Sequence, residues 1–317
     1  MKKRIISVLL ATVFALSVIG CGTKDTKEQD AYRQYGITCM ESGKYEDAVK
    51  AFQNALGESI GHIGEKELDI CFYKAKAQAL DGKTKDALAT YNAIIKYNKD
   101  ARAYYLRGDL YMDMGKEKKG RADFESAVQQ GKKNYEIYIG IYESLSRHEK
   151  KDEGQKYLSA AMEIKGDKPE DELYKGRISY LLGENKDAIS YLEKAKEHKQ
   201  MLASYYLGLA YDANGDSDKA KKCIAEYIKS GVATSYDLYE LGMQEMQDGN
   251  YKNALTYFNS GLELEKVPNK QNLMKSAIAA YEYSGDFDSA KKMMKEYLKA
   301  YPDDEEAKHE NTFLETR

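Results

Sequence analysis

Apolar residues recur at intervals of three and four along residues 30–302, which is the spacing of one face of an α-helix. The helical stretches are interrupted by a short recurring pattern: a glycine, four residues, a small residue, and then another apolar helix. The seven clear copies are Gly43/Ala48, Gly82/Ala87, Gly115/Gly120, Gly183/Ala188, Gly215/Ala220, Gly249/Ala254 and Gly285/Ala290. An eighth copy ends at Gly154, and we expect a degenerate and longer turn there, over residues 146–153. The second small residues are 39, 33, 34, 34, 32, 34 and 36 positions apart, so the period is near 34.

Two further positions repeat in phase with this pattern. Twelve residues before each second small residue stands another small residue: Gly36, Ala75, Gly108, Gly176, Gly208 and Gly242, with Gly140 two places further back in the eighth copy. Four residues after it stands a large apolar residue: Phe52, Tyr91, Phe124, Leu158, Leu192, Ile224, Phe258 and Met294. This period and pattern resemble the tetratricopeptide repeat. The resemblance covers residues 30–302 and implies an all-α, right-handed superhelical solenoid of about eight helix-turn-helix hairpins.

The physical chemistry of the pattern favours the same architecture. A turn glycine can adopt the left-handed conformation that ends a helix, and small residues let two antiparallel helices approach closely. One hairpin cannot bury its own apolar face, so neighbouring hairpins must stack. The charged, helix-prone segment 303–317 is expected to form a C-terminal capping helix.

The first repeat interval contains about five extra residues, which fall in a glycine-spaced segment, Gly57 to Gly64. Together with Tyr73 and Ala75 this segment resembles a feature of clostridial tetratricopeptide lipoproteins. Its glycines lack the spacing of a phosphate-binding loop, so we expect a lengthened turn. A catalytic or sugar-binding site in residues 57–64 is a weaker alternative.

The N-terminus has the layout of a secretory signal. Lys2, Lys3 and Arg4 precede an apolar run of about 15 residues, which is shorter than the roughly 20 residues of a membrane-spanning helix. The run ends in Val-Ile-Gly-Cys at residues 18–21, which resembles the bacterial lipobox. That resemblance implies that residues 1–20 are removed as a lipoprotein signal peptide and that the Cys21 thiol is acylated, with residues 21–29 as a polar tether. The alternatives are an ordinary signal peptide with a chance cysteine and an uncleaved anchor.

Composition and charge narrow the function classes. Hydrophobic residues make up 42% and charged residues 32% of the 317 residues, with only 3 prolines, which suits a packed and largely helical chain. The formal net charge is −3, and the charges are mixed without a basic block. Nucleic-acid binding requires a concentrated cationic surface, so we expect no nucleic-acid partner.

The residues that usually carry catalysis or bind metals form no recognisable site. The four histidines, His62, His148, His198 and His309, are far apart in the sequence. Three cysteines, Cys39, Cys71 and Cys223, remain after Cys21 and fall within expected helices, where buried thiols are more common than a disulfide framework. We therefore expect no metal, no cofactor and no enzymatic activity.

The most informative candidate site is the groove that the resemblance implies on the first helices of the hairpins. In tetratricopeptide solenoids the second, fifth, ninth and twelfth positions of these helices line the concave face. Transferred to this sequence, those positions include Phe72, Tyr105, Asp109, Met112, Tyr180, Tyr205, Asp212, Tyr236, Tyr239, Met243 and Met246. Tyrosine is common at interfaces and methionine adapts to irregular partners. The alternative is that many of these tyrosines pack between helices with only the hydroxyl in water.

The sequence therefore predicts a protein–protein interaction scaffold, lipid-anchored on the extracytoplasmic face of the cell membrane, that binds a peptide or protein in its groove. A structural or assembly factor of the cell envelope that acts by self-association is the alternative.

Overall fold

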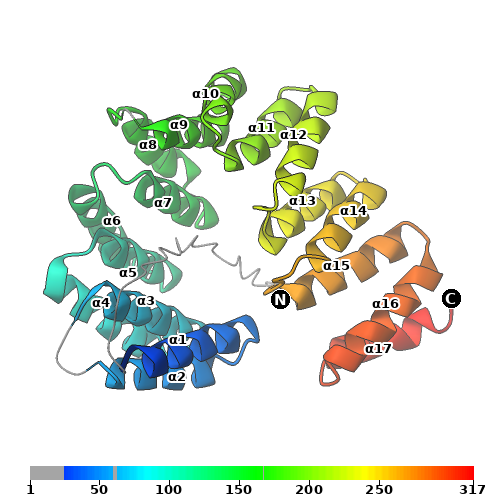
Figure 1. Cartoon of the computed structure of the whole chain (residues 1–317), viewed down its shortest axis with the longest axis horizontal. Coiled ribbons are helices and arrows are strands. Elements are labelled where there is room, and N and C mark those ends of the chain that lie inside the picture. Colours follow the sequence, from blue (N-terminus) through cyan, green and yellow to red (C-terminus); the bar gives the residue numbers. More distant parts are fainter. Residues whose placement is uncertain (1–24, 60–62, 167) are drawn as a thin grey trace. The chain divides into compact units, whose positions relative to one another are not determined.

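The chain is all-helical in the computed structural model, which describes residues 25–59, 63–166 and 168–317. These residues form 17 helices and no strands (Figure 1). The helices are α1 (Asp25–Glu41), α2 (Tyr45–Gly57), α3 (Glu65–Leu80), α4 (Thr84–Asn98), α5 (Ala101–Asp113), α6 (Glu117–Gln130), α7 (Tyr135–Arg147), α8 (Lys151–Met162), α9 (Pro169–Leu182), α10 (Asn185–Glu197), α11 (Leu202–Ala213), α12 (Ser217–Lys229), α13 (Ser235–Gln247), α14 (Tyr251–Leu262), α15 (Lys270–Tyr283), α16 (Phe287–Ala300) and α17 (Glu305–Leu314). They form two compact units, α1–α12 and α13–α17.

Consecutive helices pair into eight hairpins, followed by α17, which confirms the predicted all-α repeat solenoid. The large apolar residues of the repeat pattern form the core of each hairpin. Phe52, Phe124, Leu158, Leu192 and Phe258 are each 0% exposed. The burial of one such side chain stabilises the fold by about 1.5–3 kcal/mol.

The small residue on the first helix of a hairpin makes room for the large residue on the second. A Cβ on Gly36 would lie 2.6 Å from the ring of Phe52, and a Cβ on Gly176 would lie 2.4 Å from Leu192. The same contact recurs at Gly108, Gly208 and Gly242. The close approach of antiparallel helices that the sequence predicts is therefore confirmed, residue pair by residue pair.

The turn of the fourth hairpin differs from the sequence-based expectation. It is not longer, because α7 ends at Arg147 and α8 begins at Lys151, which leaves three turn residues, as between α5 and α6. The position that is glycine in the other seven turns is Glu149, which adopts a left-handed φ of 62°. The glycines have φ between 69° at Gly115 and 83° at Gly215, so the backbone shape is kept although the residue type is not.

Gly140 is also placed differently from the expectation. The residue twelve positions before Gly154 is Tyr142, and the absent Cβ of Gly154 lets the Tyr142 backbone approach, with its Cα 3.1 Å from where that Cβ would be. Gly140 instead faces the preceding hairpin, where its missing side chain accommodates the ring of Tyr105. The small residue has thus changed partner, from its own hairpin to the neighbouring one.

The first helix begins earlier than the solenoid boundary predicted at residue 30. Helix α1 starts at Asp25, because residues 25–29 contain no helix-breaking residue and continue the helical turn. Gln29 is buried and its amide donates a hydrogen bond to Glu67 of α3 at 2.9 Å. Part of the segment expected to be a tether therefore belongs to the first hairpin, while the predicted signal peptide and Cys21 lie outside the described residues.

The glycine-spaced segment lies between α2 and α3, and residues 60–62 of it, including His62, lie outside the described part of the chain. At its end Gly64 precedes α3, and its amide donates a hydrogen bond to Glu67 at 2.8 Å. The Tyr97 hydroxyl donates to the Ile63 carbonyl at 3.0 Å. The segment thus leads into a regular helix start that is fixed to α4.

Helix α17 covers the end of the last hairpin. Its Ala307 and Leu314 are buried in one cluster with Met274, Ile278 and Met294 of α15 and α16. The predicted C-terminal helix is therefore present and packed. No helix in the described ranges has both the length and the apolar character that crossing a membrane requires.

Candidate functional site

The candidate groove residues lie on the first helices of the hairpins, and neighbouring first helices contact one another within each unit. We call the side of α1, α3, α5, α7, α9 and α11 that carries these residues the N-terminal first-helix surface. The corresponding side of α13 and α15 is the C-terminal first-helix surface. The two surfaces belong to different units and are described separately.

Three of the predicted groove residues, all on α5, are buried. Met112 is 2% exposed, and its Sδ lies 2.7 Å from where a Cβ of Gly120 would be. Tyr105 packs its ring against Phe124 at 6.3 Å, and its hydroxyl has no hydrogen-bond partner among the described residues. These side chains fill the space within and between hairpins, so α5 does not present them to a partner. The packing alternative placed tyrosine hydroxyls in water, whereas the Tyr105 hydroxyl is buried.

Asp109, the third of these residues, is 6% exposed and forms an ion pair with Arg147 of α7 at 2.5 Å. Burial raises the pKa of the Asp109 carboxyl, while the Arg147 guanidinium opposes that rise. An ion pair in this position links two neighbouring first helices. The Asp109 carboxylate is therefore engaged in an ion pair within the fold and is not presented to a partner.

The other four predicted residues of the N-terminal unit are more accessible. Phe72 is half-buried under the guanidinium of Arg102, 4.3 Å from its ring centroid. Tyr205 is half-buried and contacts the rings of Tyr206 and Tyr227 at 5.1 and 5.3 Å. Each of the two aromatic side chains thus contributes part of its surface to packing and part to solvent.

Tyr180 and Asp212 lie near each other, on α9 and α11. Tyr180 is half-buried, and burial together with the nearby Asp212 carboxylate raises the pKa of its hydroxyl. Asp212 is exposed. These two residues form an accessible polar and aromatic pair at the ends of adjacent first helices.

The C-terminal first-helix surface keeps its predicted residues accessible. Tyr236, Tyr239, Met243 and Met246 are all half-buried on α13, at spacings of three and four residues that place them on one helix face. The Tyr239 ring lies 6.2 Å from Phe258, and the Met243 sulfur accepts a hydrogen bond from Ser276 of α15 at 3.6 Å. The Tyr239 ring and the Met243 sulfur therefore contact neighbouring helices, while all four side chains keep part of their surface in solvent.

Several charged residues of the N-terminal first-helix surface were not among the predicted site residues. Arg177 of α9 forms ion pairs with Glu136 and Glu143 of α7, at 3.2 and 3.0 Å, and lies 5.5 Å from the Tyr206 ring of α11. The second- and ninth-position rule that selected the aromatic residues also points to these three charged residues.

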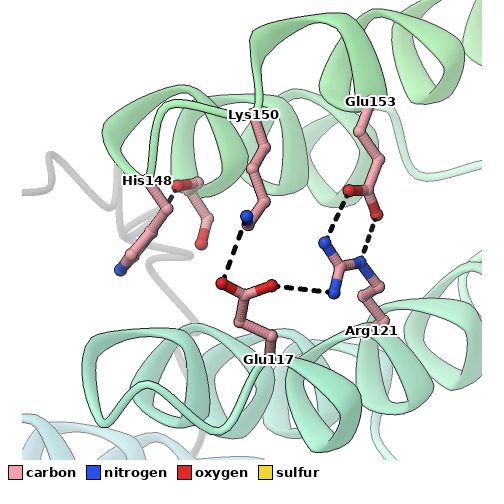
Figure 2. A network of polar contacts seen from close by, with 6 residues as sticks. Glu117, Arg121, His148, Lys150 and Glu153 are labelled. Atoms are coloured by element: carbon pink, nitrogen blue, oxygen red, sulfur yellow. Dashed lines mark hydrogen bonds and ion pairs between the residues drawn. The ribbon is translucent and has the colours of Figure 1, made fainter.

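A second polar network joins the other helices of the third and fourth hairpins (Figure 2). Arg121 of α6 binds Glu153 of α8 through two hydrogen bonds of 2.7 and 2.9 Å, and Glu117 lies 3.0 Å from Arg121 and 3.1 Å from Lys150. Lys150 and Arg121 lower the pKa of Glu117. The charges of these four residues neutralise one another, which indicates a structural role.

The described residues contain no group of three or more His, Cys, Asp or Glu side chains that could hold a metal ion. The three cysteines of this part of the chain are free thiols; Cys39 and Cys223 are buried and Cys71 is half-buried. A cleft of about 180 Å³ near the start of α9 is lined by Lys168, Asp171, Tyr191 and His198, among others. It is smaller than the roughly 300–1,000 Å³ of typical ligand pockets.

Comparison with known protein families decides the identity of the repeat. Tetratricopeptide repeat models match residues 101–130, 202–230 and 271–304, and each match spans a hairpin or most of one, beginning near its first helix. The chain contains tetratricopeptide repeats.

Solved tetratricopeptide repeat structures are similar to this chain. One is the crystal structure of a tetratricopeptide repeat protein from Parabacteroides merdae ATCC 43184, with 11% identity and a TM-score of 0.47, matched over 80% of this chain and 99% of that one. Another is PilW, described as a widely conserved type IV pilus biogenesis factor, with 18% identity, a TM-score of 0.44 and coverage of 66% and 97%. No curated protein matches the sequence.

Tetratricopeptide repeats mediate protein–protein interaction. In this tetratricopeptide repeat protein, the predicted groove residues lie on the two first-helix surfaces. The C-terminal surface has the larger continuous set of half-exposed tyrosine and methionine side chains, whereas ion pairs link much of the N-terminal surface.

Proposed function

We propose that this tetratricopeptide repeat protein is an interaction scaffold that binds a peptide or protein segment on its first-helix surfaces. The observation that carries the proposal is the row of Tyr236, Tyr239, Met243 and Met246, four half-buried side chains on one face of α13. Tyrosine is enriched among the residues that dominate binding energy at interfaces, and the flexible methionine side chain adapts to irregular partners.

A pull-down from envelope extract with the full chain tests this proposal. The variant Tyr239→Ser/Met243→Ser removes contact area from the surface, whereas Tyr97→Ser removes a tyrosine that is 54% exposed on α4, a second helix. We expect a specific partner that is retained by the Tyr97 variant and lost with the other. Equal capture by both variants would contradict the role of the surface.

We further propose that the scaffold is anchored to the extracytoplasmic face of the membrane by lipid on Cys21. The lipobox-like residues 18–21 support this, and so does the start of α1 only four residues after Cys21. Acyl chains contribute about 0.8 kcal/mol per buried methylene, so two or three chains hold a protein firmly. The short connection would keep the first hairpin close to the membrane surface.

Membrane fractionation of Cys21→Ala cells tests the anchor. We expect the native chain in the membrane fraction with a mass increased by acyl groups, and the variant without that mass increase. A native chain of unmodified mass would show that Cys21 carries no lipid. The absence of catalysis, which the scaffold role implies, remains part of the proposal.

A further inference from the structure

The two units differ in charge. Residues 233–317 contain 16 acidic and 10 basic side chains, whereas residues 22–232 contain 36 of each. The whole net charge of −6 beyond Cys21 therefore lies in the C-terminal unit. An excess confined to one unit favours partners of opposite charge on that unit.

Lys275, on the C-terminal first-helix surface, does not offset the excess of acidic side chains in this unit. Lys275 of α15 forms an ion pair with Asp304 at 2.7 Å, and the Asp304 side chain is only 11% exposed. Asp304 also accepts a hydrogen bond from the Tyr297 hydroxyl at 2.5 Å. The Lys275 charge is thus already neutralised within the fold.

Two acidic residues near the end of the same surface, Glu282 of α15 and Glu310 of α17, form no ion pair with a lysine or arginine within the part of the chain that the structure describes. Glu282 of α15 has a buried Oε1 that accepts no hydrogen bond from any described residue. Burial and the neighbouring Glu310 of α17 raise the pKa of Glu282. No lysine or arginine in the described ranges forms an ion pair with either residue. A cation placed at the two carboxyls would therefore relieve both the repulsion and the missing contact.

The apolar part of the surface leads toward this acidic pair. Met243 contacts Ser276 of α15, and Met246 packs beside the core cluster that includes Ala280 of the same helix. Ala280 precedes Glu282 by two residues. Tyr283, next in the chain, is 67% exposed with its ring 5.4 Å from that of Tyr251, and an aromatic ring also attracts cations.

We propose that the C-terminal first-helix surface binds an amphipathic, cationic peptide segment, an inference that rests on the proposed function and names its partner class. The apolar side chains of the segment lie on Tyr239, Met243 and Met246. Its lysine or arginine side chains reach Glu282 and Glu310. The neutralised ion-pair ladder of the N-terminal surface has no equivalent attraction for such a segment.

A binding titration with two model peptides tests this proposal. One peptide is a helix of leucine and lysine with the two residue types on opposite faces, and the other replaces each lysine by glutamine. Fluorescence anisotropy with the full chain in nonionic detergent, and with empty micelles as the blank, gives the Kd of each. We expect the lysine peptide to bind at least about tenfold more tightly than the glutamine peptide.

Two pairs of variants distinguish a direct contact of the peptide with Glu282 and Glu310 from a general attraction by the negative charge of the unit. Glu282→Gln/Glu310→Gln is expected to weaken binding of the lysine peptide by about tenfold. The control Glu263→Gln/Glu265→Gln removes the same charge from exposed residues after α14 and is expected to change Kd less than about twofold. Equal weakening by both pairs, or no difference between the two peptides, would overturn the proposal.

This inference and the proposed function can fail separately. A partner that is captured through Tyr239 but lacks a cationic segment would refute the peptide class and leave the scaffold intact. Tight, Glu282-dependent binding of the lysine peptide without any envelope partner would support the site chemistry and count against the scaffold role.

Discussion

Gly242 of α13 lies against Phe258 of α14 so closely that a Cβ on Gly242 would be 2.2 Å from the Phe258 ring. Phe258 is 0% exposed and the ring of Tyr239 lies 6.2 Å from it. The absence of a side chain at Gly242 therefore lets Phe258 pack close to α13, directly beneath Tyr239 of the proposed interaction surface.

A methyl group at this position should disturb the hairpin. We expect Gly242→Ala to lower the free energy of unfolding by about 1–3 kcal/mol, because the core must shift to admit the added carbon. The gain of about 1 kcal/mol in helix propensity from glycine to alanine opposes this loss. Urea denaturation followed by circular dichroism measures the difference.

Gly57→Ala is the matched control, since a Cβ there meets nothing within 4 Å and the residue has no positive φ. It should be neutral or slightly stabilising. The double variant Gly242→Ala/Phe258→Leu should recover part of the loss. Equal stability of the two single variants would show that the contact at Gly242 is not tight.

The turn of the fourth hairpin offers a stabilising substitution. Glu149 adopts a φ of 62°, where a side chain costs about 1 kcal/mol relative to glycine. Glu149→Gly should therefore raise the free energy of unfolding by up to about 1 kcal/mol, less the entropy that glycine adds to the unfolded chain.

The converse substitution, Gly115→Ala, tests the same argument in the preceding hairpin. Gly115 has a φ of 69°, so the alanine variant should lose about 1 kcal/mol. A stabilised Gly115→Ala together with a destabilised Glu149→Gly would contradict the account of these turns. Thermal unfolding of both variants beside the native chain gives the answer.

The C-terminal helix should be acid-sensitive through Asp304. Lys275 and the Tyr297 hydroxyl, together with the Ala307 amide, lower the pKa of Asp304 well below its ordinary value. Because the folded-state pKa lies below that of the unfolded chain, Asp304 stabilises the fold above the unfolded-state pKa of about 4 and loses this contribution as the pH falls.

Asp304→Asn isolates this contribution. At about pH 7 we expect the variant to be less stable than the native chain by about 1 kcal/mol, and at about pH 3 the difference should have shrunk. The measurement is the free energy of unfolding of both chains across this range. A difference that stays constant or grows on acidification would show that the Asp304 carboxylate is not held by its partners.

The hairpins could be predicted from the sequence because the residues that define them interact within one repeat. Gly36 and Phe52, or Gly176 and Leu192, lie 16 positions apart and contact each other in the same hairpin. A repeating local pattern therefore identifies both partners at once. The backbone shape at Glu149 escaped prediction because the geometry of the turn is imposed by its neighbours rather than by the residue itself.

The accessible residues of the surface were harder to predict, because burial depends on the residue that faces each side chain, in its own hairpin or in the next. Tyr105 is buried since Gly140, in the following hairpin, leaves room for its ring, and Met112 is buried since Gly120, in its own hairpin, leaves room for its sulfur. Position along a first helix cannot distinguish such residues from Tyr239 or Met243. The size of the residue that faces each side chain, such as Gly140 for Tyr105 and Gly120 for Met112, would have predicted which side chains are buried.

Site-specific photo-cross-linking in living cells tests the central claim most directly. A photoreactive phenylalanine analogue is introduced into the full chain at Tyr239, on the C-terminal first-helix surface, and separately at Tyr97, on a second helix. Both positions carry a tyrosine, so the substitutions are matched in size. The account predicts that irradiation joins one specific envelope protein to the chain at Tyr239 and not at Tyr97. Cross-linking to that protein from Tyr97 alone, or from neither position, would contradict it.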